Sequence, residues 1–267
     1  MNVESRVIDG LHVEISGPDS APPLIFGHSL LCNGRMWEAQ VADLARDFRC
    51  VNIDFRGHGH SPAAKSGFSM ADQGEDYLKV MDAVGIPKAT IVGLSMGAMA
   101  AMHLVDRHPE RVTALAFFNT SADPQASKLR FSALGVMARA FGLVPFLRKQ
   151  AFAEMFGKSF RASGSPALAV WDAHFAALDR QGGYRALRMV VSRPSMIERL
   201  AAIRVPLMVV AGEEDTATPA ACGRRIVERV PGAEWHLIPT GHLSAVENPE
   251  LVTKLIREFA TKVTKSI

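Results

Sequence analysis

This sequence has few cysteines, a small net charge and no internal repeat. The first two features each exclude a class of protein. Three cysteines in 267 residues, widely spaced and without a CxxC pair, argue against a disulfide scaffold and a zinc site. The 30 Lys and Arg against 27 Asp and Glu leave a net charge of +3, and the basic residues are scattered, so we expect no nucleic-acid partner. Cys32, Cys50 and Cys222 are expected to be buried free thiols in a cytoplasmic protein.

Long apolar runs and an N-terminal targeting segment are also missing. Residues 1–10 contain three charged side chains and no apolar core, so no signal peptide is expected. The stretch 89–105 carries no Asp, Glu, Lys or Arg, but Gly93 and Gly97 in its middle predict a turn. We therefore expect a buried strand followed by a buried helix there, and no association with a membrane.

What the sequence does contain is an ordinary globular composition, with 48% hydrophobic and 21% charged residues. Short apolar runs alternate with helical patterns, and several runs are apolar throughout, which is typical of strands covered on both faces. The alternation predicts an α/β fold with a mostly parallel sheet. The expected strands are 12–16, 23–28, 49–54, 89–94, 112–118, 206–212 and 234–238. The expected helices are 36–46, 70–84, 96–107, 219–229 and 249–263.

The alternation stops between residues 121 and 195, where aromatic residues gather among glycine and proline breaks. This segment predicts a helical insertion at the carboxyl edge of the sheet, where folds of this kind bind ligands. The predicted division is a core domain of residues 1–120 and 196–267 with a helical cap of residues 121–195.

Residues 93–97 read Gly-Leu-Ser-Met-Gly, which has the spacing GxSxG. An apolar run precedes this motif and an Ala/Met-rich helical pattern follows it. A strand that turns sharply into a helix strains the residue between them, and small flanking glycines avoid a clash. We therefore predict that Ser95 is a nucleophile exposed at the edge of the sheet. A tight turn that happens to contain a serine is the alternative.

A serine hydroxyl needs a base, and nine histidines compete for that role. His242 is the predicted base because it follows the last expected strand and precedes the final helix. His58 and His60 lie in a glycine-rich loop near the sheet edge and are the main alternatives.

The base in turn needs an acid that holds its ring. Asp215 follows the expected strand 206–212 and is the predicted acid. The order Ser95, Asp215, His242 agrees with the nucleophile–acid–base order of α/β-hydrolases. The neighbouring acids that remain as alternatives are Glu213, Glu214 and Asp123.

An oxyanion formed during acyl transfer needs two hydrogen-bond donors. The residue after the nucleophile supplies one, and the loop after an early strand supplies the other. This places the donors at the backbone N–H groups of Met96 and Leu30. The assignment of Leu30 rests on its position in the loop alone.

These segments together resemble the α/β-hydrolase superfamily over nearly the whole chain. The resemblance implies an eight-stranded, mostly parallel sheet with a helical cap. It also makes residues 54–61, which match DxRGxGxS, a structural turn, and so weakens the case for His58 and His60 as bases. Within the superfamily the sequence is most similar to 3-oxoadipate enol-lactonases and small carboxylesterases. That similarity rests on His28-Ser29-Leu30 with Met36-Trp37 and Gln40, and on residues 241–244 with Glu247 and Pro249.

The resemblance implies hydrolysis of a carboxylic ester or lactone through an acyl-enzyme, with a small molecule as the partner and neither cofactor nor metal. An enol-lactone of this type carries a carboxylate, so its pocket should hold an Arg or Lys. Cap candidates are Lys128, Arg130, Arg139, Arg161, Arg185, Arg188 and Arg193. The Phe and Met residues of the cap suit a hydrophobic acyl group equally well. Alternatives are a carbon–carbon bond hydrolase of ring-cleavage products and a ligand receptor on a hydrolase scaffold. A homo-oligomer is left open.

Overall fold

The structure, a computed structural model, describes residues 3–125 and 127–266 and contains one eight-stranded sheet within them. The strand order is β1-β2-β4-β3-β5-β6-β7-β8. All pairs from β4 onward are parallel, whereas β2 is antiparallel to both of its neighbours. The predicted α/β fold with a mostly parallel sheet is confirmed. The strands are β1 Val3–Ile8, β2 Leu11–Ser16, β3 Pro23–Gly27, β4 Arg49–Ile53, β5 Ala89–Leu94, β6 Val112–Phe118, β7 Leu207–Gly212 and β8 Glu234–Ile238.

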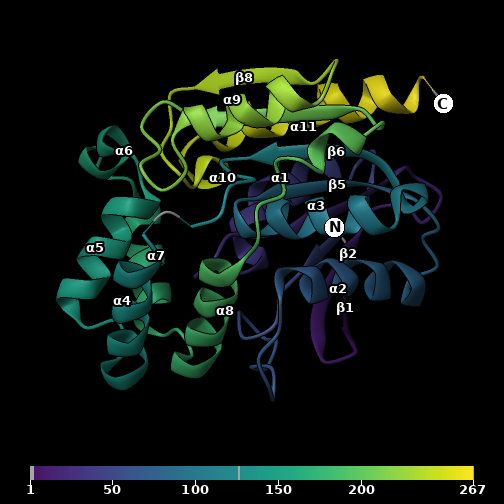
Figure 1. Cartoon of the computed structure of the whole chain (residues 1–267). Helices are drawn as coiled ribbons and strands as arrows, with labels where there is room; N and C mark the ends of the chain where they lie inside the picture. Colours follow the sequence, from purple (N-terminus) through teal and green to yellow (C-terminus); the bar gives the residue numbers. More distant parts are fainter. Residues whose placement is uncertain (1–2, 126, 267) are drawn as a thin grey trace.

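The sheet separates two apolar cores, and consecutive residues of one strand face opposite cores. Ile25 of β3 packs in the core beneath the helices α2, α3 and α9, whereas Leu24 and Phe26 pack in the core beneath α1 and α11. Figure 1 shows these helices around the sheet. Their bounds are α1 Glu38–Leu44, α2 Met70–Ala83, α3 Met96–Arg107, α9 Ala220–Arg229 and α11 Pro249–Thr264, and a short helix, α10, spans Ser244–Glu247. The first expected helix, 36–46, begins instead as the 3₁₀ turn η1 at Gly34–Trp37.

Five further helices lie between β6 and β7, and we call them the cap helices. They are α4 Lys128–Phe141, α5 Pro145–Met155, α6 Lys158–Ala162, α7 Pro166–Ala176 and α8 Arg180–Ser192. Figure 1 shows them together beyond the arrowheads of β6 and β8, at the carboxyl ends of the parallel strands. Hydrogen bonds join them to the sheet edge, including Leu243 N–H to the Met155 carbonyl at 3.0 Å. They therefore cover the edge at which Ser95 lies.

The cysteines and the uncharged stretch 89–105 are the next features of the fold. Cys32 and Cys50 are buried free thiols as predicted, but Cys222 is partly exposed, so the prediction of burial is wrong for that residue. Cys222 lies on α9 outside both apolar cores, where Arg225 Nη2 donates to its sulfur at 3.4 Å. The stretch 89–105 forms β5, the turn at Ser95 and α3, as predicted. None of the helices in the described ranges is long and apolar enough to cross a membrane.

Candidate active site

The turn between β5 and α3 holds Ser95 in a strained backbone conformation, with φ 51° and ψ −109°. Space around the turn is too small for side chains at its two glycines. A Cβ on Gly93 would lie 2.5 Å from the Ala98 nitrogen, and one on Gly97 would lie 2.2 Å from the Gly27 carbonyl oxygen. A non-glycine residue is kept at positive φ only where its surroundings over-determine the turn. The local geometry is therefore that of a nucleophile elbow.

Asp215 and His242 lie in contact although 27 positions separate them. Asp215 follows β7 and His242 follows β8, and His242 Nδ1 lies 3.0 Å from Asp215 Oδ2 and 3.1 Å from Oδ1. Both side chains are almost fully buried. The Thr218 hydroxyl donates to Asp215 Oδ2 at 2.8 Å, and Asn119 Nδ2 donates to the same oxygen at 3.0 Å. The carboxylate is thus held in place from three sides.

These contacts keep Asp215 ionised. Burial by itself raises the pKa of the Asp215 carboxyl, but the adjacent His242 and the hydrogen bonds from His242, Thr218 and Asn119 outweigh it, so the pKa lies below its usual value. An ionised carboxylate only accepts hydrogen bonds, so Nδ1 of His242 carries the proton and donates to it. This leaves Nε2 of His242 as the acceptor. That is the tautomer a general base requires.

The acceptor nitrogen of His242 faces Ser29, for which the sequence predicted no contact with the base. Ser29 Oγ is 3.4 Å from His242 Nε2 and is fully buried. In the part of the chain that the structure describes, no hydrogen bond joins the Ser95 hydroxyl to His242, and Ser95 keeps 7% of its surface exposed. The structure therefore brings Asp215 and His242 together and places Ser95 at the neighbouring elbow without the serine–histidine bond.

The loop that carries Ser29 lies against the elbow. Gly97 N–H donates to the His28 carbonyl at 3.1 Å, which fixes the loop beside the start of α3. The backbone N–H groups of Leu30 and Met96 donate to no acceptor among residues 3–125 and 127–266, whereas Leu31 N–H donates to His58 Nε2 at 3.3 Å. Two unpaired donors near one elbow form an arrangement that can bind an oxyanion.

The alternative bases are accounted for by other contacts. Both ring nitrogens of His58 are occupied, because Nδ1 faces the Arg56 carbonyl at 3.2 Å and Nε2 accepts from Leu31. His28 likewise donates to its neighbour Ser29 through Nδ1 and accepts from Phe55 N–H through Nε2. His60 is largely exposed beside Asp54. The structure thus uses His58 to hold the loop that carries Leu30 and Leu31.

The buried histidines predict acid sensitivity. Burial lowers the pKa of His28 to about 4 and that of His58 to about 3. Both lie below the value of about 6.5 for an unfolded chain, so the unfolded state takes up these protons first and stability is lost as pH falls below about 6.5. Between pH 7 and pH 5 the free energy of unfolding should fall by about 2 kcal/mol for each histidine, or about 4 kcal/mol together.

Urea titrations at the two pH values measure this loss. A His58→Gln variant should lose about 2 kcal/mol less between them, because one of the buried titrating rings is gone. Equal stability of the wild type at both pH values would contradict the assignment of neutral buried rings.

The other acids near Asp215 serve different contacts. Glu213 is exposed, and Glu214 accepts from Ser159 N–H of α6 at 2.7 Å, which ties a cap helix to the core. Asp123 pairs with Arg225 at 2.6 Å. Glu247 accepts from Gly241 N–H at 2.7 Å and so holds the backbone next to His242. Thr218 and Asn119 lie in no motif that the sequence offered, and Ser29 appeared there only as part of His28-Ser29-Leu30, with no role of its own.

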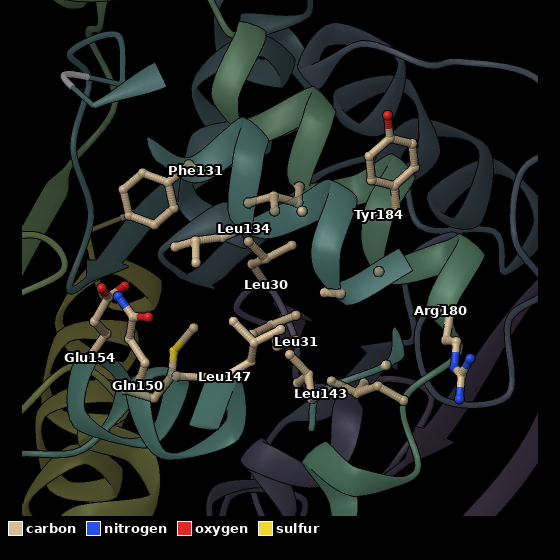
Figure 2. A pocket seen from close by; sticks show the side chains of 18 of the residues that line it. Leu30, Leu31, Phe131, Leu134, Leu143, Leu147, Gln150, Glu154, Arg180 and Tyr184 are labelled. Carbon is tan, nitrogen blue, oxygen red and sulfur yellow. The ribbon is translucent and has the colours of Figure 1, made fainter. Parts of the chain in front are cut away.

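An apolar cavity of about 120 Å³ lies between the cap helices and the loop at Leu30 and Leu31. Figure 2 shows the leucines of the loop and those of α4 and α5 gathered at its centre, with Gln150 and Glu154 on one side and Arg180 on the other. Leu30 places the cavity next to one of the two unpaired amides. Ser95, Met96, Asp215 and His242 do not line it, so Leu30 is the residue that the cavity shares with the proposed site.

The basic residues proposed to meet a substrate carboxylate are mostly engaged elsewhere. Arg130 pairs with Glu154 at 2.8 Å, Arg139 and Arg188 lie over the Tyr184 ring, and Arg193 donates to the Val190 carbonyl at 2.7 Å. None of the cap candidates lines the apolar cavity among the described residues; its basic residue is Arg180.

The sheet, the elbow and the Asp–His pair define the α/β-hydrolase class. The sequence matches the α/β-hydrolase fold family over residues 22–249, and this chain belongs to that family. The resemblance stated from its motifs is confirmed, and with it the prediction of a hydrolase enzyme.

Several known proteins are similar to this chain over most of their length. 3-Oxoadipate enol-lactonase 1 of Acinetobacter baylyi is 28% identical over 253 residues, covering 95% of this chain and 94% of that protein. The uncharacterized carboxylesterase nap of Bacillus subtilis is 28% identical over 265 residues, covering 93% and 82% respectively. The crystal structure of the enol-lactonase from Burkholderia xenovorans superimposes with a TM-score of 0.90 at 29% identity, covering 97% of this chain and 100% of that one.

Proposed function

We propose that this protein is a serine hydrolase that cleaves a carboxylic ester or lactone. Ser95 is the nucleophile, His242 the base and Asp215 the residue that orients it, with the Leu30 and Met96 amides as the oxyanion hole. The observation that carries the proposal is the buried His242–Asp215 pair, at 3.0 Å, beside a strained serine elbow. The relatives named as enol-lactonase and carboxylesterase support the same reaction class.

The chemistry follows from these positions. Ser95 Oγ attacks the acyl carbon while His242 Nε2 takes its proton, and the carbonyl oxygen becomes an oxyanion held by the two amides. The intermediate collapses, and His242 returns the proton to the leaving alkoxide, or to the ring oxygen of a lactone. Water then attacks the acyl-enzyme by the same route, so that a carboxylic acid is released and Ser95 regains its proton.

The mechanism requires the Ser95 hydroxyl to approach Nε2, which faces Ser29 in this structure. Catalytic hydrogen bonds are often long or misaligned in ligand-free enzymes and shorten when substrate binds. We propose that an acyl group in the apolar cavity brings this approach about, since the cavity and the oxyanion loop share Leu30.

The cavity predicts a preference for apolar acyl groups. Each methylene moved from water into it contributes about 0.8 kcal/mol, so kcat/KM should rise about fourfold per methylene from p-nitrophenyl acetate to the hexanoate. Leu134→Gln, which places an amide in the cavity, should abolish most of that rise. Val136→Gln is the matched control, because Val136 lies on the same helix with its side chain 56% exposed.

Other outcomes separate the rival functions. A series in which acetate is the best ester would contradict an apolar acyl site. Turnover of a carboxylated enol-lactone above all the neutral esters would favour an enol-lactonase, and cleavage of a ring-cleavage dienone with no ester hydrolysis would favour the carbon–carbon hydrolase.

A further inference from the structure

Three side chains from separate segments meet at the surface beside the turn of residues 54–61. His12 lies in β2, Asp54 follows β4, and His60 lies in the turn itself. Asp54 Oδ2 is 3.3 Å from His12 Nδ1 and 3.5 Å from His60 Nδ1. The three donor atoms all lie within 4.8 Å of one another. None of these residues belongs to the proposed catalytic group.

The spacing fits the ligands of a tetrahedral metal ion. Bonds of about 2.0–2.1 Å to zinc place neighbouring ligand atoms about 3.3–3.4 Å apart. Both distances from the Asp54 oxygen are close to this spacing. The remaining distance, between the two imidazole nitrogens, can close by rotation of His60, whose side chain is 76% exposed.

The ligands are also held in the orientation that metal binding requires. His12 Nε2 lies 2.9 Å from the Ser5 hydroxyl, which fixes the ring with Nδ1 toward Asp54. Asp54 accepts from Gly34 N–H at 2.7 Å and from His60 N–H at 2.9 Å. A carboxylate has about four lone-pair sites, so capacity for a metal remains after these two bonds.

The charges around the site favour a cation. Glu14 lies two residues from His12, on the same face of β2, and lines the same surface cleft. Arg35 also lines that cleft, but its charge is partly offset by Glu38 at 3.5 Å. The cleft therefore brings one almost buried carboxylate and a second acidic side chain near two imidazoles.

We propose that His12, Asp54 and His60 bind one divalent transition-metal ion of the zinc type, with water completing its coordination. Imidazole ligands select zinc, copper or nickel over magnesium and calcium, which prefer oxygen ligands. Because Asp54 also holds Gly34 and His60 by their backbone, the ion fixes the turn of residues 54–61 against β2. Its role is structural, and it takes no part in acyl transfer.

The test is a calorimetric titration of the untagged, chelator-treated protein with Zn²⁺. We expect the titration to saturate at one Zn²⁺ ion per chain. The midpoint of thermal unfolding should also rise by about 5–10 °C when free Zn²⁺ is a hundredfold above Kd. His12→Ala and His60→Ala should each weaken binding by about 100-fold or more, since loss of an outer partner alone costs about 10–100-fold. His236→Ala is the matched control, because His236 also lies near a carboxylate, that of Glu234 at 3.8 Å.

Co²⁺ provides a second readout that does not depend on stability. Bound Co²⁺ in a tetrahedral site should give visible d–d absorption that is lost in the two histidine variants. Failure of the wild type to bind Zn²⁺ saturably would overturn the proposal. Binding that survives in the His12→Ala/His60→Ala double variant, or that is lost in Cys222→Ser or His236→Ala, would overturn the location.

Discussion

Replacing Ser95 with alanine is expected to lower kcat for an activated ester by about 10⁶. The hydroxyl is the atom that forms the acyl-enzyme, and alanine leaves the oxyanion amides and the binding cavity unchanged. The residual rate should be that of the oxyanion hole and binding alone. Single-turnover and steady-state hydrolysis of the preferred p-nitrophenyl ester measure the loss, and KM should change little.

Ser29→Ala is the discriminating variant, since Ser29 is the serine in contact with His242 Nε2. A phosphonate probe should label Ser95 in both the wild type and Ser29→Ala, and mass spectrometry of the labelled peptide identifies the site. Loss of labelling in Ser29→Ala with full labelling of Ser95→Ala would show that the nucleophile is misassigned. Substantial ester turnover by Ser95→Ala would end the proposed mechanism.

Replacing Asp215 with asparagine is expected to lower kcat by about 10⁴ while leaving the fold intact. The amide matches the carboxylate in size, but it cannot accept from Nδ1 and from Thr218 and Asn119 in the same way. Its NH₂ group favours the opposite tautomer of His242, in which Nε2 carries the proton and cannot act as a base. Because Asp215 is ionised in the wild type, the substitution also removes the charge that stabilises the imidazolium.

Glu213→Gln provides the matched control for this variant. Glu213 lies two residues before Asp215 and its side chain is exposed. Removing its carboxylate should therefore leave kcat unchanged. The pH dependence of kcat/KM in Asp215→Asn distinguishes catalysis from misfolding, because a loss of base function is partly recovered at high pH. A loss of equal size in Glu213→Gln would contradict the role given to Asp215.

The sheet illustrates how far local pattern predicts fold. Seven of the strands are predicted by local pattern, and the clearest, such as β5 and β7, are apolar runs because strands buried on both faces need apolar side chains at nearly every position. The missing strand, β1, alternates Val3, Ser5 and Val7 with Glu4 and Arg6 and is almost wholly exposed. Its stability comes from antiparallel pairing with β2 and not from burial, so its residues give no hydrophobic signal.

By itself the sequence determined seven of the strands, the main helices of the core and the elbow. A strand, a turn and a helix are each formed by neighbouring residues. The sequence therefore predicts the strand before Ser95, the glycines of the turn and the helix after it. The predictions of His242 as the base and Asp215 as the acid also follow from order along the chain, because each residue lies just after an expected strand.

The tertiary structure decided which distant groups meet. Contacts of Ser29 with His242, of Thr218 and Asn119 with Asp215, and of His12 with Asp54 depend on the register of strands and on loop paths, which chain spacing does not encode. The apolar cavity is likewise formed only when α4 and α5 pack over the Leu30 loop. Such convergence is set by the packing of the whole core, so chemistry spread over several segments becomes visible only in the folded chain.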